Sequence, residues 1–213
     1  MGRSIKLYER IAKVVGVSNP QVTDVDIYDS LNDVQTQVAQ RLLCIEKSGT
    51  LTVTSGVASV PTGFFRLKRI VMPDGTAIFP QEIDVQEYDT FEHLLFTNIA
   101  NTVQYYKIWN SQITFFPTPA NTTYTVFYYG IPTTTIVGTP TSASEVEPEL
   151  PSYMDECLRY GALSDLLAQS NDDKSLAKAS YYKQQYDEEL SRLEKTWRKT
   201  KTVSNQIYYS DVM

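Results

Sequence analysis

LLCIEKSGTLTVTSGV, residues 42–57, is the stretch in which the hydrophobic period of the chain changes. Upstream of it, apolar residues recur at three- and four-residue steps over residues 27–45, which predicts an amphipathic helix that ends at Ser48-Gly49. Downstream, apolar residues alternate with polar ones, and Ser55-Gly56 supplies a hairpin turn. The sequence therefore predicts that a helical part of the chain gives way here to a β part.

Three other segments have the apolar spacing of amphipathic helices. We expect one helix over residues 4–15 that stops at Gly16, one that opens at Ser152, and one over about residues 174–199. Ser152 followed by Asp155 resembles a capping box. Thr23 or Asp24 can cap the helix that precedes the change of period. Periodicity disappears beyond Thr200, which predicts a tail.

Short β-prone runs separated by turn signals lie between the second and third of these helices. Pro73-Asp74-Gly75 and Asn110-Ser111 are typical turn sequences. Residues 84–96 are loosely periodic and predict a short helix. Strands are predicted at residues 66–72, 104–109, 112–116 and 124–129. Short strands separated by turns indicate a small antiparallel sandwich or barrel.

The order of the segments predicts an α+β fold. We expect a four-helix bundle-like core, because each helix has one apolar stripe and the four must pack on each other. A small antiparallel β lobe is inserted between the second and third helices, and an extended C-terminal tail follows the fourth. The assigned ranges are 1–48 and 150–200 for the helical bundle, 49–135 for the β lobe, 136–149 for a linker rich in Thr, Ser and Pro, and 201–213 for the tail.

Charge and tyrosine content bound the class of partner. The net charge of −6 argues against a surface that binds duplex DNA throughout, because phosphates require clustered Lys and Arg. A local basic patch remains compatible with it. The fifteen tyrosines fit either an interface protein, where tyrosine is enriched, or a β-rich domain, which uses much tyrosine in its strands. Both interpretations stay open at this point.

The residues that carry chemistry are sparse. His93 is the single histidine, and neither Cys44 nor Cys157 has the spacing of a zinc site. Buried free thiols fit a reducing cytoplasm. Carboxylate pairs occur only where acids suit helix starts or polar faces: Asp155/Glu156, Asp172/Asp173 and Glu188/Glu189. We therefore expect no enzymatic activity, no metal and no cofactor.

No membrane partner is expected either. No apolar run is long enough to cross a bilayer, and no apolar region of a signal peptide follows residues 1–10.

A basic cluster lies late in the chain, and it is made of Arg192, Lys195, Arg198, Lys199 and Lys201. One interpretation is charge that stabilises the C-terminus of a helix. The other is contact with an acidic partner surface, or with DNA that passes nearby without being read by sequence.

Two stretches give the chain a resemblance to a known family. The first contains VP at 60–61, FRLKRIV at 65–71, YYKIWNSQITFFPTP at 105–119 and YTVFYYGIP at 124–132. The second contains ELPS at 149–152 and the helical segments 158–167 and 177–193. In this order of strands and helices the chain resembles the head-to-tail adaptors of tailed phages, also called connectors, tail tubular or gatekeeper proteins.

The resemblance implies a structural protein of the virion neck. It implies a ring of twelve copies beneath the portal protein ring, with a tail nozzle or tail tube protein on the far side and DNA passing through the channel during ejection. Such a protein is assembled in the host cytoplasm. In this family a C-terminal extension reaches into clefts of the portal, and the resemblance assigns that part to the tail here. The expected portal-docking residues are Val203, Ile207, Tyr208, Tyr209 and Val212.

Two other classes of function remain as alternatives. The tyrosine-rich β lobe could be a binding module that recognises a glycan or a host receptor, which requires exposed aromatic side chains along a groove. A cell-wall hydrolase would need paired carboxylates or a metal in a deep pocket, and the sequence offers no such arrangement.

Overall fold

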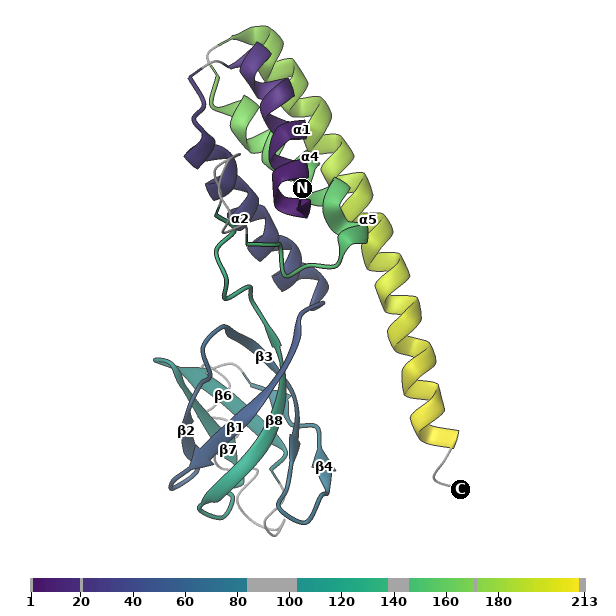
Figure 1. The fold of residues 1–213 in the computed structure, drawn as a ribbon. Helices are drawn as coiled ribbons and strands as arrows, with labels where there is room; N and C mark the ends of the chain where they lie inside the picture. Colours follow the sequence, from purple (N-terminus) through teal and green to yellow (C-terminus); the bar gives the residue numbers. More distant parts are fainter. Residues whose placement is uncertain (1, 20, 84–102, 138–145, 171, 211–213) are drawn as a thin grey trace. The chain divides into compact units, whose positions relative to one another are not determined.

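The computed structural model describes residues 2–19, 21–83, 103–137, 146–170 and 172–210. The chain forms two compact units, a helical unit of Met1–Cys44 with Thr134–Met213 and a β unit of Ile45–Thr133 (Figure 1). The short helix predicted at residues 84–96 lies outside the described residues.

The helical unit contains, within the described residues, four α-helices and one 3₁₀ turn. They are α1 (Arg3–Ser18), α2 (Asp24–Leu42), η1 (Ser152–Met154), α4 (Asp155–Ala168) and α5 (Asp173–Ser210). Helix α1 passes through Gly16, where the sequence predicted its end, because Asn19 still donates its N–H to the Val15 carbonyl. The capping box predicted from Ser152 is absent, since the start of α4 has no side-chain cap.

Helix α2 begins as predicted and ends earlier than predicted. Thr23 and Asp26 form a capping box, in which each side chain accepts a hydrogen bond from the other residue's N–H. The helix stops at Leu43, whose φ of 50° places it in the left-handed region. Glu46 then starts strand β1, so the expected end at Ser48-Gly49 was wrong.

Helix α4 is the centre of the helical unit. It packs against α1, α2 and α5, and its Leu158, Leu163 and Leu166 are completely buried. At Gly161 a Cβ atom would lie 2.6 Å from Val34 of α2 and 3.1 Å from Tyr186 of α5. Glycine therefore lets both neighbouring helices approach α4 closely.

One half-buried and one buried polar side chain of α2 fasten the returning chain to the helices. Asn32 of α2 accepts the N–H of Ile136 at 2.7 Å and donates to its carbonyl at 3.0 Å. Gln35 accepts the N–H of Glu149 at 2.7 Å. These bonds fix the segment that leads from the β unit into α4.

Arg3 ties the first helix to the start of α4. Its guanidinium pairs with Asp155 and also donates to the carbonyl oxygens of Pro148, Leu150 and Pro151, at 3.2, 2.6 and 3.0 Å. One half-buried side chain thus satisfies three carbonyls just before a helix start.

Within its described residues, the β unit contains two four-stranded sheets. The strands are β1 (Glu46–Val53), β2 (Val57–Ser59), β3 (Phe64–Val71), β4 (Ala77–Ile78), β5 (Gln81–Glu82), β6 (Tyr105–Trp109), β7 (Gln112–Phe116) and β8 (Thr122–Gly130). One sheet has the order β1-β8-β3-β4 and the other β2-β7-β6-β5. The β5–β6 pair is parallel and the other pairs are antiparallel.

The two sheets share one apolar core. Leu51, Leu67 and Val126 come from one sheet, and Tyr106 and Ile113 come from the other. The turns that the sequence predicted are confirmed. Ser55-Gly56 and Asn110-Ser111 have both residues at positive φ, which suits the twist of a two-residue hairpin.

The predicted fold class was therefore wrong in two respects, although the chain is a mixed α+β protein. The helices do not form a four-helix bundle core, because α4 is a hub for the other helices and the β unit buries a separate core of its own. Nor is there an extended tail from residue 201, since α5 continues to Ser210. No glycine or proline follows Gly161 to interrupt that helix.

Candidate functional site

Reactive groups do not converge in the part of the chain that the structure describes. There, no group of three or more His, Cys, Asp or Glu side chains could hold a metal ion. Burial raises the pKa of the Cys157 thiol to about 12, which keeps it protonated near neutral pH. His93 lies outside the described residues.

The carboxylate pairs noted in the sequence have structural partners. Asp155 binds Arg3, and Glu156 pairs with Arg10 at 2.8 Å as well as with Arg159. Asp172 accepts the N–H of Ser175 at 3.1 Å, which caps the start of α5. These contacts account for the acids through helix starts and ion pairs.

Helix α5 is the most extended feature of the helical unit (Figure 1). Its 38 residues span about 57 Å, whereas the 14 residues of α4 span about 21 Å. Its buried side chains recur from Ser175 to Leu193, along the part that packs on α4. Glu194 then accepts a hydrogen bond from Arg41 of α2 at 2.6 Å. The C-terminal turns of α5 therefore lie beyond the length that α4 can cover.

The basic cluster lies inside α5 and not at its end. The last turn of α5 contains no basic residue, and Lys201 precedes Ser210 by nine positions. Because the helix macrodipole acts on the last turn, it does not explain this cluster, and that interpretation was wrong.

Within the cluster, Arg192 is already paired. It donates to both carboxylate oxygens of Glu189, at 2.8 and 2.5 Å, and these hydrogen bonds lower the pKa of Glu189. Lys195 is exposed. Arg198, Lys199 and Lys201 lie on the following turns of the same helix.

The expected portal-docking residues fall in the last turns of α5. Val203, Ile207, Tyr208 and Tyr209 belong to this helix, and Val212 lies outside the described residues. The structure thus brings the basic cluster and most of these residues onto one continuous helix. The sequence could have predicted this continuous helix, because no helix-breaking residue follows Gly161.

Tyrosines of the β unit are directed mainly into its core. Tyr106, Tyr124 and Tyr128 are buried, and burial raises the pKa of each. Among the described residues of this unit, the most exposed aromatic side chains are those of Phe79 and Trp109, each 67% exposed, and both lie outside strand β8. Because the three tyrosine rings are buried, they cannot line the exposed aromatic groove that a glycan-binding module requires.

No described helix is both long enough and apolar enough to span a membrane.

Comparison with protein families gives a match over most of the chain. The family described as SU10 adaptor protein matches residues 6–207, which include all but the first and last few residues of the helices and the whole β unit. No curated protein matches the chain. The matched range includes α5 as far as Ile207. The chain belongs to the SU10 adaptor protein family.

Proposed function

We propose that this phage adaptor joins the portal ring to the tail of the virion and lines part of the channel through which DNA passes. Membership of the SU10 adaptor protein family supports a structural role among virion proteins. The portal ring, a tail nozzle or tail tube protein and neighbouring copies in a ring of twelve are the partners that this role requires. Assembly takes place in the host cytoplasm.

The observation that carries the proposal is the length of α5 relative to the helices that pack on it. The helix spans about 57 Å whereas α4 spans about 21 Å, so the C-terminal turns of α5 extend past α4, and we assign these turns to a partner. Val203 and Ile207 are four residues apart, which is the spacing that a helix uses to place two side chains in one groove. We therefore place portal docking at Val203, Ile207, Tyr208, Tyr209 and Val212.

Since residues 203–210 continue α5, the docking element is a helix end and not a disordered tail that folds on binding. A helix that exists before binding loses less conformational entropy on docking than a flexible chain does. Tyrosines near the docking end would supply apolar area together with a polar tip.

The basic cluster precedes the docking end by a few turns. Arg192 is paired with Glu189, so we assign contact with an acidic partner surface or with passing DNA to the other members of the cluster, Lys195, Arg198, Lys199 and Lys201. Four cations suit weak, salt-sensitive contact better than tight DNA binding.

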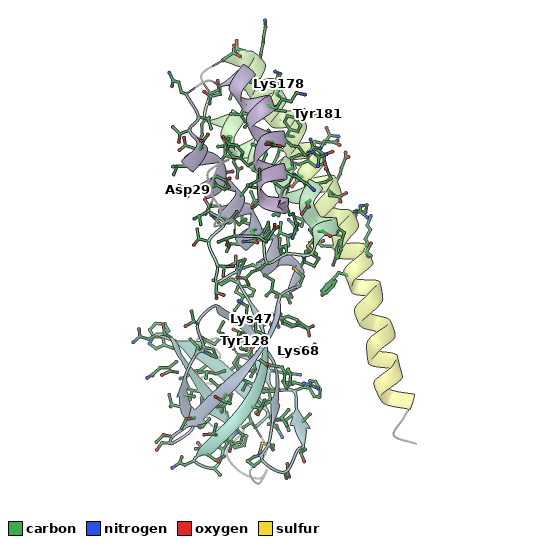
Figure 2. All side chains as sticks on the ribbon, viewed as in Figure 1. Asp29, Lys47, Lys68, Tyr128, Lys178 and Tyr181 are labelled. Carbon is green, nitrogen blue, oxygen red and sulfur yellow. The ribbon has the colours of Figure 1, made fainter. Side chains whose placement is uncertain are left out.

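The test is a truncation after Thr202, measured as binding to the isolated portal ring. Removing the docking residues is expected to weaken binding at least tenfold, which is the scale of one lost hot spot. The matched control is Tyr181→Ser, which removes an exposed aromatic side chain from the packed half of the same helix (Figure 2). Equal affinities of the truncated and full-length chains for the portal would remove the end of α5 from the proposed function.

A further inference from the structure

The sheet β1-β8-β3 has an outward face whose side chains form rows across the strands. Tyr124, Val126 and Tyr128 of β8 point into the core, so Thr125, Phe127 and Tyr129 point the other way. The strand register then gives three rows on this face: Glu46–Tyr129–Arg66, Ser48–Phe127–Arg69 and Thr50–Thr125–Val71.

Most charges on this face are already balanced. Lys68 donates to Glu46 at 2.6 Å and lies 5.7 Å from the centre of the Tyr129 ring. Arg66 pairs with Glu82 at 3.7 Å. Figure 2 labels Lys68 on this unit.

Arg69 is the exception. Its guanidinium carbon lies 4.1 Å from the centre of the Phe127 ring, so the group is stacked on the sheet. Its Nε is buried without a hydrogen-bond acceptor, and no described acid forms an ion pair with Arg69. A guanidinium stacked on a ring holds its N–H donors in a plane parallel to that ring, where its terminal N–H groups can donate to a carboxylate. Among the described residues, therefore, no acceptor binds the Nε of Arg69 and no acid pairs with its guanidinium.

The β unit also presents an acid that no described cation neutralises. Its described acids are Glu46, Asp74 and Glu82, and of these Glu46 and Glu82 are paired. Asp74 lies in the exposed turn between β3 and β4, where its carboxylate accepts the N–H of Thr76 at 2.8 Å. That hydrogen bond lowers the pKa of Asp74 and keeps the carboxylate ionised.

We propose that the outward face around Arg69 is a contact between copies of this chain, in which Arg69 of one copy binds Asp74 of the next. Two different patches of one surface make a heterologous contact, and such contacts close into a ring when the rotation per subunit divides a full turn. The inference rests on the proposed function, because it supplies a specific contact for the ring of adaptors.

A polyanion is a poorer occupant of the same face. Three cations, Arg66, Lys68 and Arg69, stand there against the two carboxylates Glu46 and Glu82. DNA phosphates need clustered cations without interspersed acids, whereas a single protein carboxylate needs one free guanidinium. The rings of Phe127 and Tyr129 are also covered by cations and do not offer a stacking surface for bases.

The experiment is a charge-reversal cycle in the full-length chain, with assembly on the isolated portal ring as the measurement. Arg69→Glu and Asp74→Arg are expected to weaken assembly at least about tenfold each, since each places like charges together. The double variant Arg69→Glu/Asp74→Arg is expected to recover most of the loss, because the pair is restored with the charges exchanged. Lys68→Ala is the control, since Lys68 is already paired with Glu46 within the chain.

Each outcome bears on the proposal. Recovery in the double variant supports the contact between copies. Additive losses, or single variants that assemble like the wild type, overturn it, and so does a loss in Arg69→Glu that is matched by lost binding of a 30-base-pair duplex. If the wild type fails to bind the portal ring at all, the proposed function itself is wrong. Thermal unfolding of each free variant shows whether the chain is still folded.

Discussion

The β unit and the helical unit hold their chain by different means. In the β unit, alternating side chains from two sheets fill one apolar core, and tight turns connect successive strands. In the helical unit, apolar packing centres on α4, while Arg3, Asn32 and Gln35 fasten the returning segment through polar contacts. The difference teaches that alternation along the strands determines which side chains fill the β core, whereas the helical unit depends on polar pairs more than one hundred positions apart.

The largest expected losses of stability come from substitutions in the two apolar cores, one in each unit. Ile113→Ala in the β unit and Leu158→Ala in α4 both remove completely buried side chains. Each is expected to lower the free energy of unfolding by about 2–5 kcal/mol. Because the units have separate cores, calorimetry should show each substitution lowering the melting temperature of a different transition. A single melting transition that both substitutions shift equally would show that the two units do not unfold separately.

The next largest effect is expected at Arg3, whose guanidinium ties α1 to the start of α4. Arg3→Ala leaves Asp155 and three backbone carbonyls without their donor, and we expect a loss of about 2–3 kcal/mol in urea unfolding. Arg10→Ala is the matched control on the same helix, because its pair with Glu156 is exposed and worth less than about 1 kcal/mol. If both variants lost the same free energy of unfolding, the Arg3 contacts would contribute no more to stability than an exposed ion pair does.

Close packing at α4 gives a smaller effect. Gly161→Ala forces a Cβ against Val34, and a stiff β-branched side chain yields little, so we expect about 1–2 kcal/mol of destabilisation. Gly16→Ala has nothing within 4 Å of the new Cβ and lies within α1. That control should be neutral or stabilise by about 0.5–1 kcal/mol. A stabilising Gly161→Ala, measured by chemical denaturation, would mean that the helices can move apart there.

The smallest effect concerns the basic cluster and depends on pH. The folded pKa of Glu189 is lowered, so its pair with Arg192 stabilises the chain above the ordinary pKa of the carboxyl, and this contribution is lost as the pH falls through the lowered value. Arg192→Gln should therefore cost less than about 0.5 kcal/mol at pH 7 and nothing at pH 2–3. Lys195→Gln, which removes an exposed charge from the same helix, should change stability at neither pH.

Local signals predicted much of both units. The apolar stripe of α2, the capping position at Thr23 and the hairpin turns at Ser55-Gly56 and Asn110-Ser111 were all readable, because each depends on neighbours in sequence. The end of α2 could not be predicted from the sequence, because the residue that adopts the left-handed conformation there is Leu43 and not a glycine. Arg3, Asn32 and Gln35 also escaped prediction, since their acceptors and donors lie far along the chain.

The roles of the basic cluster and of the docking residues stay predictions, whereas the element that carries them differs from the one predicted. The basic cluster and the apolar residues after Val203 were identified from sequence, yet they were assigned to a helix end followed by a tail. The loss of apolar periodicity after Thr200 predicted that the helix ends there. Helix α5 has no helix-breaking residue in that stretch, however, and continues to Ser210. Apolar periodicity predicts which side of a helix packs, and it does not by itself predict where an unpacked helix ends.

The most direct test of the account is electron microscopy of the full-length chain mixed with its isolated portal ring. The account predicts class averages in which a second ring, absent from images of the portal alone, lies on one face of the portal. It also predicts that the chain truncated after Thr202 gives few such particles under the same conditions. Portal particles that look identical with and without the full-length chain, at concentrations well above those of assembly, would contradict the central claim.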